Sequence, residues 1–70
     1  MKEITLEEYM NRVKNIVFSK TGDKKYVDKL DKDIKRSYNE AKRLKDVLGY
    51  GTPDPNGYAL GILMMYPEVP

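Results

Sequence analysis

The sequence predicts an all-α fold: an antiparallel helical hairpin over about residues 6–19 and 24–48, a loop rich in Gly and Pro, and a short apolar C-terminal helix over about residues 55–65. Two observations support this. Apolar residues recur at spacings of three and four along both longer segments, and turn-forming residues separate the segments. With 70 residues, no Cys and no His, the chain is expected to form a single domain, residues 1–70, held together by packing alone.

The first predicted helix has a clear start signal. Thr5 is followed three residues later by Glu8, which is the spacing of a capping box, in which each residue bonds the amide of the other. Gly22 suits a left-handed helix end, and Asp23 suits the cap of a following helix. A tight turn is therefore expected between the first two helices. The apolar stripe of the first helix consists of Leu6, Tyr9, Met10, Val13, Ile16 and Val17.

The second predicted helix contains neither Gly nor Pro between Lys24 and Leu48, so the sequence predicts one continuous helix that Gly49 ends. Eight of its side chains share an arc of about 120°, the width of a helix that packs on one side and faces water on the other. These eight residues are Tyr26, Val27, Leu30, Ile34, Tyr38, Ala41, Leu44 and Leu48.

The apolar segment from Tyr58 to Tyr66 follows a loop, and its periodicity alone allows a helix or a strand. We favour a helix because Asp54 can cap it and Pro55 suits the first helical position, whereas a single strand would lack a partner in this chain. Nearly every side of such a helix is apolar, so part of it should stay uncovered in a monomer. The candidate protein-interface residues are Tyr58, Leu60, Ile62, Leu63, Met64, Met65 and Tyr66.

The chemistry of the side chains argues against an enzyme. Without Cys and His, the chain cannot form a Ser-His-Asp triad, a cysteine nucleophile or a typical zinc site, and its acidic residues stand singly between lysines. We therefore expect no catalytic residue, no metal site and no cofactor.

Two motif-like patterns in the loop are interpreted as turns. Thr52, Asp54 and Asn56 fall at the first three ligand positions of a calcium loop, but Leu63 stands where the bidentate Glu is required. The run Gly49-Tyr50-Gly51 begins like a dinucleotide fingerprint, yet no strand precedes it and Asp54 occupies the sixth position.

A basic stripe lies opposite the apolar face of the second predicted helix. Acidic neighbours, Asp28, Asp33 and Glu40, weaken its field, and the net charge of +2 is small for a dedicated nucleic-acid binder. The stripe could still follow a phosphate backbone, with a loop tyrosine stacking on a base. The candidate anion-binding residues are Lys25, Lys29, Lys32, Arg36, Arg43 and Tyr50.

Two functional hypotheses follow. The first is a small non-enzymatic protein-interaction module, self-associating, that binds and blocks a macromolecular partner; small chains of this general character are frequent among phage and mobile-element accessory products, including inhibitors of host defence. The alternative is a binder of nucleic acid or a nucleotide. A DNA-reading regulator is less favoured, because helix-turn-helix domains use shorter helices. Lacking a secretory signal or an apolar run of roughly 20 residues, the chain is expected in the cytoplasm, that of the host cell if it is phage-encoded, without a membrane partner.

Overall fold

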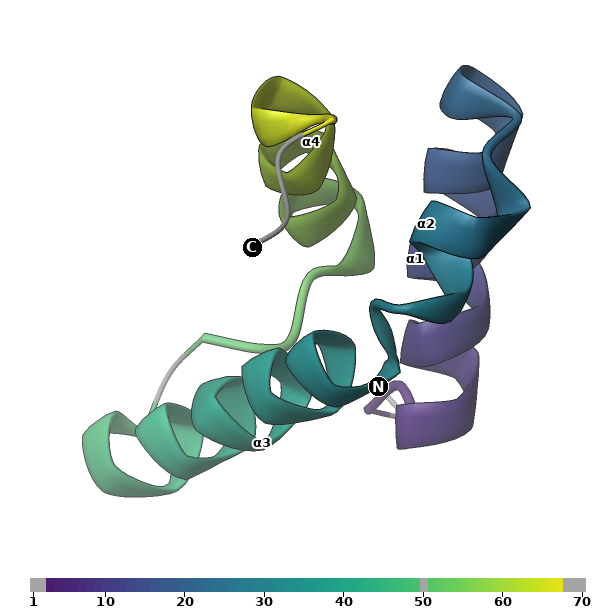
Figure 1. Ribbon diagram of the computed structural model, residues 1–70. Coiled ribbons are helices and arrows are strands. Elements are labelled where there is room, and N and C mark those ends of the chain that lie inside the picture. The colour runs from purple at the N-terminus through teal and green to yellow at the C-terminus, as the bar shows by residue number, and fades with distance from the viewer. Residues whose placement is uncertain (1–2, 50, 68–70) are drawn as a thin grey trace.

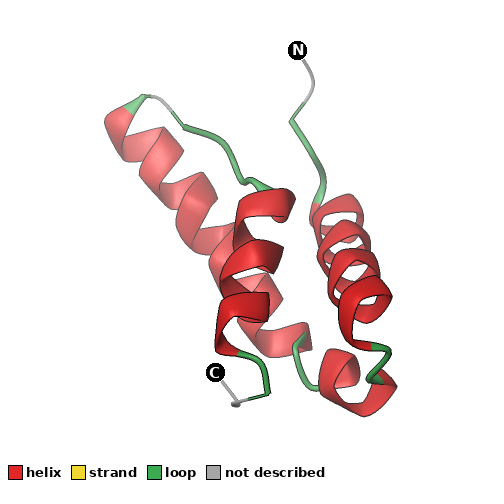
Figure 2. Cartoon of the chain, turned by 90° about the horizontal axis from the view of Figure 1, so that it is seen from above, coloured by secondary structure: helices red, strands yellow, loops and turns green. Residues whose placement is uncertain are grey.

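The computed structural model describes residues 3–49 and 51–67 of the chain. Within these ranges all regular structure is helical: α1 (Leu6–Thr21), α2 (Lys24–Asp28), α3 (Asp31–Leu48) and α4 (Pro55–Met65). In Figure 1, α1 and α4 stand beside each other, and α3 lies below α4. In Figure 2, α1 and α3 run in opposite directions, as the predicted hairpin requires. The predicted all-α fold is confirmed, including the C-terminal helix.

The chain turns between α2 and α3, at Lys29 and Leu30, so the predicted helix over residues 24–48 is divided into two. The amide of Lys29 bonds the carbonyl of Tyr26 at 3.1 Å, and that of Leu30 bonds the carbonyl of Val27 at 3.0 Å. Bonds to the third preceding residue wind the backbone more tightly than an α-helix does. No Gly or Pro marks the turn. It places Leu30, which is 1% exposed, in the core beside the buried Tyr26 and Val27, so packing outweighs local helix propensity here.

The helix ends follow the capping signals of the sequence. Thr5 Oγ1 accepts the Glu8 amide at 3.1 Å, and Glu8 Oε1 accepts the Thr5 amide at 3.1 Å, which completes the predicted capping box. Gly22 and Gly49 end α1 and α3 with φ of 65° and 78°, values that glycine adopts without steric cost. The Asp54 side chain caps α4, as predicted.

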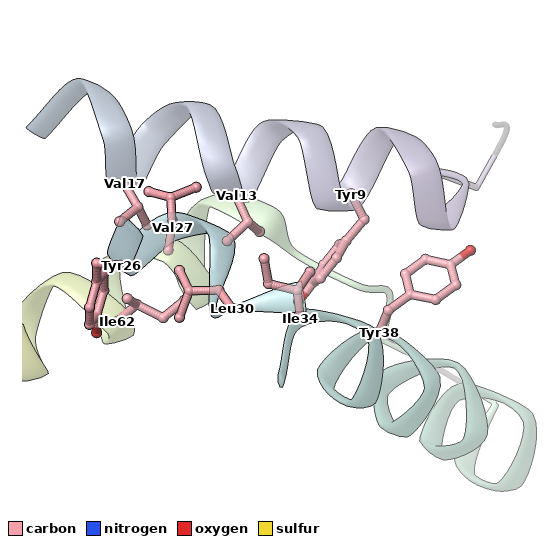
Figure 3. Packing of buried hydrophobic residues seen from close by; sticks show 10 residues of the cluster. Tyr9, Val13, Val17, Tyr26, Val27, Leu30, Ile34, Tyr38 and Ile62 are labelled. Carbon is pink, nitrogen blue, oxygen red and sulfur yellow. The ribbon is translucent and has the colours of Figure 1, made fainter. Parts of the chain in front are cut away.

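The core lies between α1 and the other three helices. Figure 3 shows buried side chains of α1 directed toward α2 and α3, and Ile62 of α4 completes the cluster near Tyr26. Tyr9 shares a 2.9 Å hydrogen bond with Ser37, which satisfies its buried hydroxyl. The core consists of Tyr9, Val13, Val17, Tyr26, Val27, Leu30, Ile34, Tyr38, Ala59 and Ile62.

The last turns of α3 extend beyond this core, away from α1 and α4 in both Figure 1 and Figure 2. The N-terminal segment meets α3 at two points. The Tyr38 hydroxyl donates to the carbonyl oxygen of Ile4 at 2.8 Å, and Lys45 Nζ pairs with Glu3 Oε1 at 2.8 Å. Ala41 is half-buried, and no residue of α3 after Tyr38 is fully buried. The core is thus complete before α3 ends.

Candidate interaction surfaces

The predicted interface residues of the C-terminal segment fall into three groups by exposure. Ile62 is 4% exposed and belongs to the core. Tyr58, Leu63 and Tyr66 are half-buried, while Leu60, Met64 and Met65 are exposed. The structure therefore brings only the last three together on the outer side of α4.

The half-buried tyrosines fasten α4 to the rest of the molecule. The ring of Tyr58 stacks on that of Tyr9, with centroids 6.2 Å apart and planes at 30°. Tyr66 contacts Tyr26 edge to face, with centroids 4.8 Å apart. Such aromatic pairs contribute about 0.5–1.5 kcal/mol each beyond their buried area. Tyr58 and Tyr66, which were predicted to contact a partner, thus make contacts that stabilise the fold.

Asp23 joins the start of α2 to the end of α4. Its carboxylate accepts the Tyr26 amide at 3.0 Å and the Tyr66 hydroxyl at 3.0 Å. These bonds favour the charged form, so the backbone bond from Tyr26 first, and then the bond from Tyr66, lower the pKa of Asp23. The same bond to Asp23 raises the pKa of the Tyr66 hydroxyl, because it stabilises the protonated phenol. This link fixes which side of α4 faces outward.

The outer face of α4 consists of Leu60, Met64 and Met65, with exposed fractions of 61%, 81% and 51%. With 3.6 residues per turn, these three side chains fall within an arc of about 140° around the helix. Gly57 and Gly61 are also exposed and fall within the same arc, because Gly57 lies three residues before Leu60, and Gly61 lies three and four residues before Met64 and Met65. None of the eleven residues of α4 is charged, so this face carries no charge along its length.

A second apolar surface, the α3 end, consists of Leu44, Val47 and Leu48, which are 49%, 74% and 52% exposed. From their spacing, Leu44 and Leu48 were predicted to belong to the packed stripe, and Val47 was not predicted to belong to any surface. Helix length is the signal that could have located this surface: at about 1.5 Å per residue, the first helix predicted over residues 6–19 cannot cover the longer one predicted over residues 24–48. The final turns of the longer helix must then extend beyond the first helix and lack a packing partner there.

The predicted anion-binding residues are only partly brought together. Lys32, Arg36 and Arg43 line one open groove of about 430 Å³ on α3, which Lys35, Asn39 and Glu40 complete. Lys25 and Lys29 precede the turn at Leu30 and are not part of the groove, and Tyr50 lies outside the described residues. Lys35 and Asn39 were missed, although their spacing from Lys32 and Arg36 places them on the same helix face.

Acidic residues beside this groove reduce its positive potential. Arg36 lies 4.0 Å from Asp33, and Arg43 lies 3.7 Å from Glu40, which itself lines the groove. Asp33 is half-buried and the other three side chains are exposed, so each pair contributes little stability, but each carboxylate still offsets a neighbouring cation. Two lysines are then left as the main positive charges of the groove.

Within residues 3–49 and 51–67, no three acidic side chains converge in a way that could hold a metal ion. None of the described helices has the length and apolar character needed to cross a membrane. Comparison of the chain with protein-family models, with curated proteins and with solved structures found no match.

Proposed function

We propose that this chain is a non-enzymatic protein-interaction module that acts by occupying a surface on a macromolecular partner. The observation that carries this proposal is that the core closes while two groups of large apolar side chains, the outer face of α4 and the α3 end, stay in contact with water. Contiguous apolar patches on small monomers most often mark interaction sites. These side chains contribute little to the core, so a binding role explains their presence better than folding does.

The α3 end is suited to a protein groove. Leu44, Val47 and Leu48 follow the i, i+3, i+4 spacing by which an amphipathic helix inserts one apolar face into a groove. Their exposed fractions together equal nearly two whole side chains, so their burial would contribute about 3–5 kcal/mol. The projection of this end beyond the core lets a groove enclose it without displacing α1 or α4.

Affinity capture with a matched pair of variants tests the proposal. The double variant Leu44→Asp and Leu48→Asp removes the apolar face, whereas Asn11→Asp and Asn15→Asp makes the same charge change at the same spacing on exposed positions of α1. A protein that the wild type and the asparagine variant retain from a lysate of the source cells is then purified. Its affinity for each variant is measured by calorimetry.

We expect the leucine variant to bind this protein at least about tenfold more weakly, as truncation of central interface residues usually does. The affinity of the wild type should change little between about 50 and 200 mM salt, because apolar contacts release few counterions. Glutamine at both leucine positions provides an uncharged variant if aspartate unfolds the helix end. Equal binding by the wild type and the leucine variants would refute the proposal, as would the absence of any protein that depends on these leucines.

The groove of α3 favours a second candidate function, the binding of a nucleic-acid backbone. Among the described residues, Lys32 and Lys35 form no ion pair, and Arg36 and Arg43 line the same groove. For this function, binding of a labelled oligonucleotide should weaken at least about tenfold between about 50 and 200 mM salt. Lys32→Glu with Arg36→Glu should abolish it. Failure to bind at the lower salt concentration would exclude this candidate.

A further inference from the structure

We infer that the outer face of α4 is a self-association surface, on which a second copy of this chain packs across Gly61. This inference rests on the proposed binding function and names one partner for one of the two surfaces. The face presents Leu60, Met64 and Met65 to solvent around the exposed Gly61. In Figure 2, α4 lies in front of α3 and beside α1.

Neither packing nor backbone conformation requires a glycine at position 61 in the monomer. A Cβ atom built at Gly61 would meet no atom within 4 Å, and its φ is not in the left-handed region. Glycine inside a helix is less favourable than alanine, so the monomer alone gives no reason for it. Gly57 differs, because a Cβ there would lie 2.9 Å from Asp54 Oδ2, in the cap of α4. A small residue between large apolar ones instead allows a second backbone to approach closely.

The charge distribution favours a second copy as the occupant. In a two-fold symmetric dimer the same patch meets itself, so a charge near the axis would face its own copy. The chain contains 24 charged residues, 13 basic and 11 acidic, yet none occurs in α4. This helix is therefore a surface that can meet itself without repulsion between like charges.

The exposed area sets the strength of the dimer. The exposed fractions of Leu60, Met64 and Met65 amount to about two whole side chains, or about 400 Å² for a pair of copies at roughly 100 Å² each. Even with contributions from neighbouring residues, this lies below the roughly 1,200 Å² of standard stable interfaces. A reversible dimer with a dissociation constant of about 10 µM to 1 mM is therefore expected.

Sedimentation equilibrium of the full chain over about 10 µM to 1 mM tests the inference. Gly61→Gln adds an uncharged side chain that favours a helix but blocks close approach, and Met64→Asp places a charge on the face. Asn15→Asp is the control, with the same charge change as Met64→Asp on an exposed position of α1. Thermal unfolding at micromolar concentration verifies that each variant folds.

We expect the wild type and Asn15→Asp to dimerise alike, and both α4 variants to dissociate at least about tenfold more readily. Gly61→Gln should unfold at no lower a temperature than the wild type, because the new side chain meets no atom of its own chain. A wild type that stays monomeric at 1 mM would overturn the inference, as would α4 variants that dimerise as tightly as the wild type. A monomer that still captures a partner through the α3 end would leave the proposed function intact.

Discussion

Replacement of Leu30 by alanine is expected to remove a large part of the free energy of unfolding. Leu30 is 1% exposed and lies in the turn between α2 and α3, where its side chain packs in the core. Truncation of a buried leucine costs about 2–5 kcal/mol through lost burial and the cavity left behind. A domain of 70 residues has a total stability of only about 3.5–10 kcal/mol. The variant should thus be marginally stable or unfolded.

Urea titration followed by circular dichroism measures this effect. Leu60→Ala makes the same chemical change on the outer face of α4, where the side chain is 61% exposed, and should alter the free energy of unfolding by less than about 1 kcal/mol. Both variants are compared at micromolar protein concentration, where the proposed dimer is dissociated. A cost for Leu30→Ala below about 1 kcal/mol, or equal to that of Leu60→Ala, would show that the turn does not place Leu30 in the core.

Three smaller predictions concern polar and backbone contacts. Tyr9→Phe removes the 2.9 Å bond to Ser37 and should lower the free energy of unfolding by about 1 kcal/mol in urea titration; an unchanged value would contradict that bond. Gly22→Ala should lower it by about 1 kcal/mol, because φ there is 65°, and a stabilised variant would contradict this conformation. The pKa of Asp23 in the folded protein lies below its ordinary value of 3.8. The ionised Asp23 therefore stabilises the fold above pH 3.8, and this stabilisation is lost as the pH falls through the lowered pKa. In Asp23→Asn, the free energy of unfolding should therefore fall less steeply with decreasing pH than in the wild type. The same pH dependence in both proteins would exclude this role of Asp23.

The helix ends could be predicted because short-range chemistry decides them. The Thr5 and Glu8 pair, the left-handed Gly22 and Gly49, and the Asp54 cap each depend on residues within a few positions. The turn at Leu30 could not be predicted in the same way. It contains no turn-forming residue, and its backbone is held by the packing of side chains from several helices.

The sequence predicted that α4 would have an exposed apolar side, but not which residues would form it. Apolar residues lie on all sides of this helix, so the sequence does not indicate which side packs against the core and which stays exposed. Ile62 faces inward and Met64 outward because Tyr58 and Tyr66 fasten the helix to Tyr9 and to α2, and these contacts span the length of the chain. The α3 end went unrecognised for a related reason, since its leucines continue a stripe whose first half is buried.

The methionine methyl groups provide the most direct measurement of the central claim, that the apolar surface left uncovered on α4 associates. In NMR spectra of the full chain with isotope-labelled methionine methyl groups, the signals of Met64 and Met65 should shift between about 10 µM and 1 mM protein. The signal of Met10, which is partly buried against the core, should stay constant. Constant signals from Met64 and Met65 over this range, or an equal shift of Met10, would contradict the account.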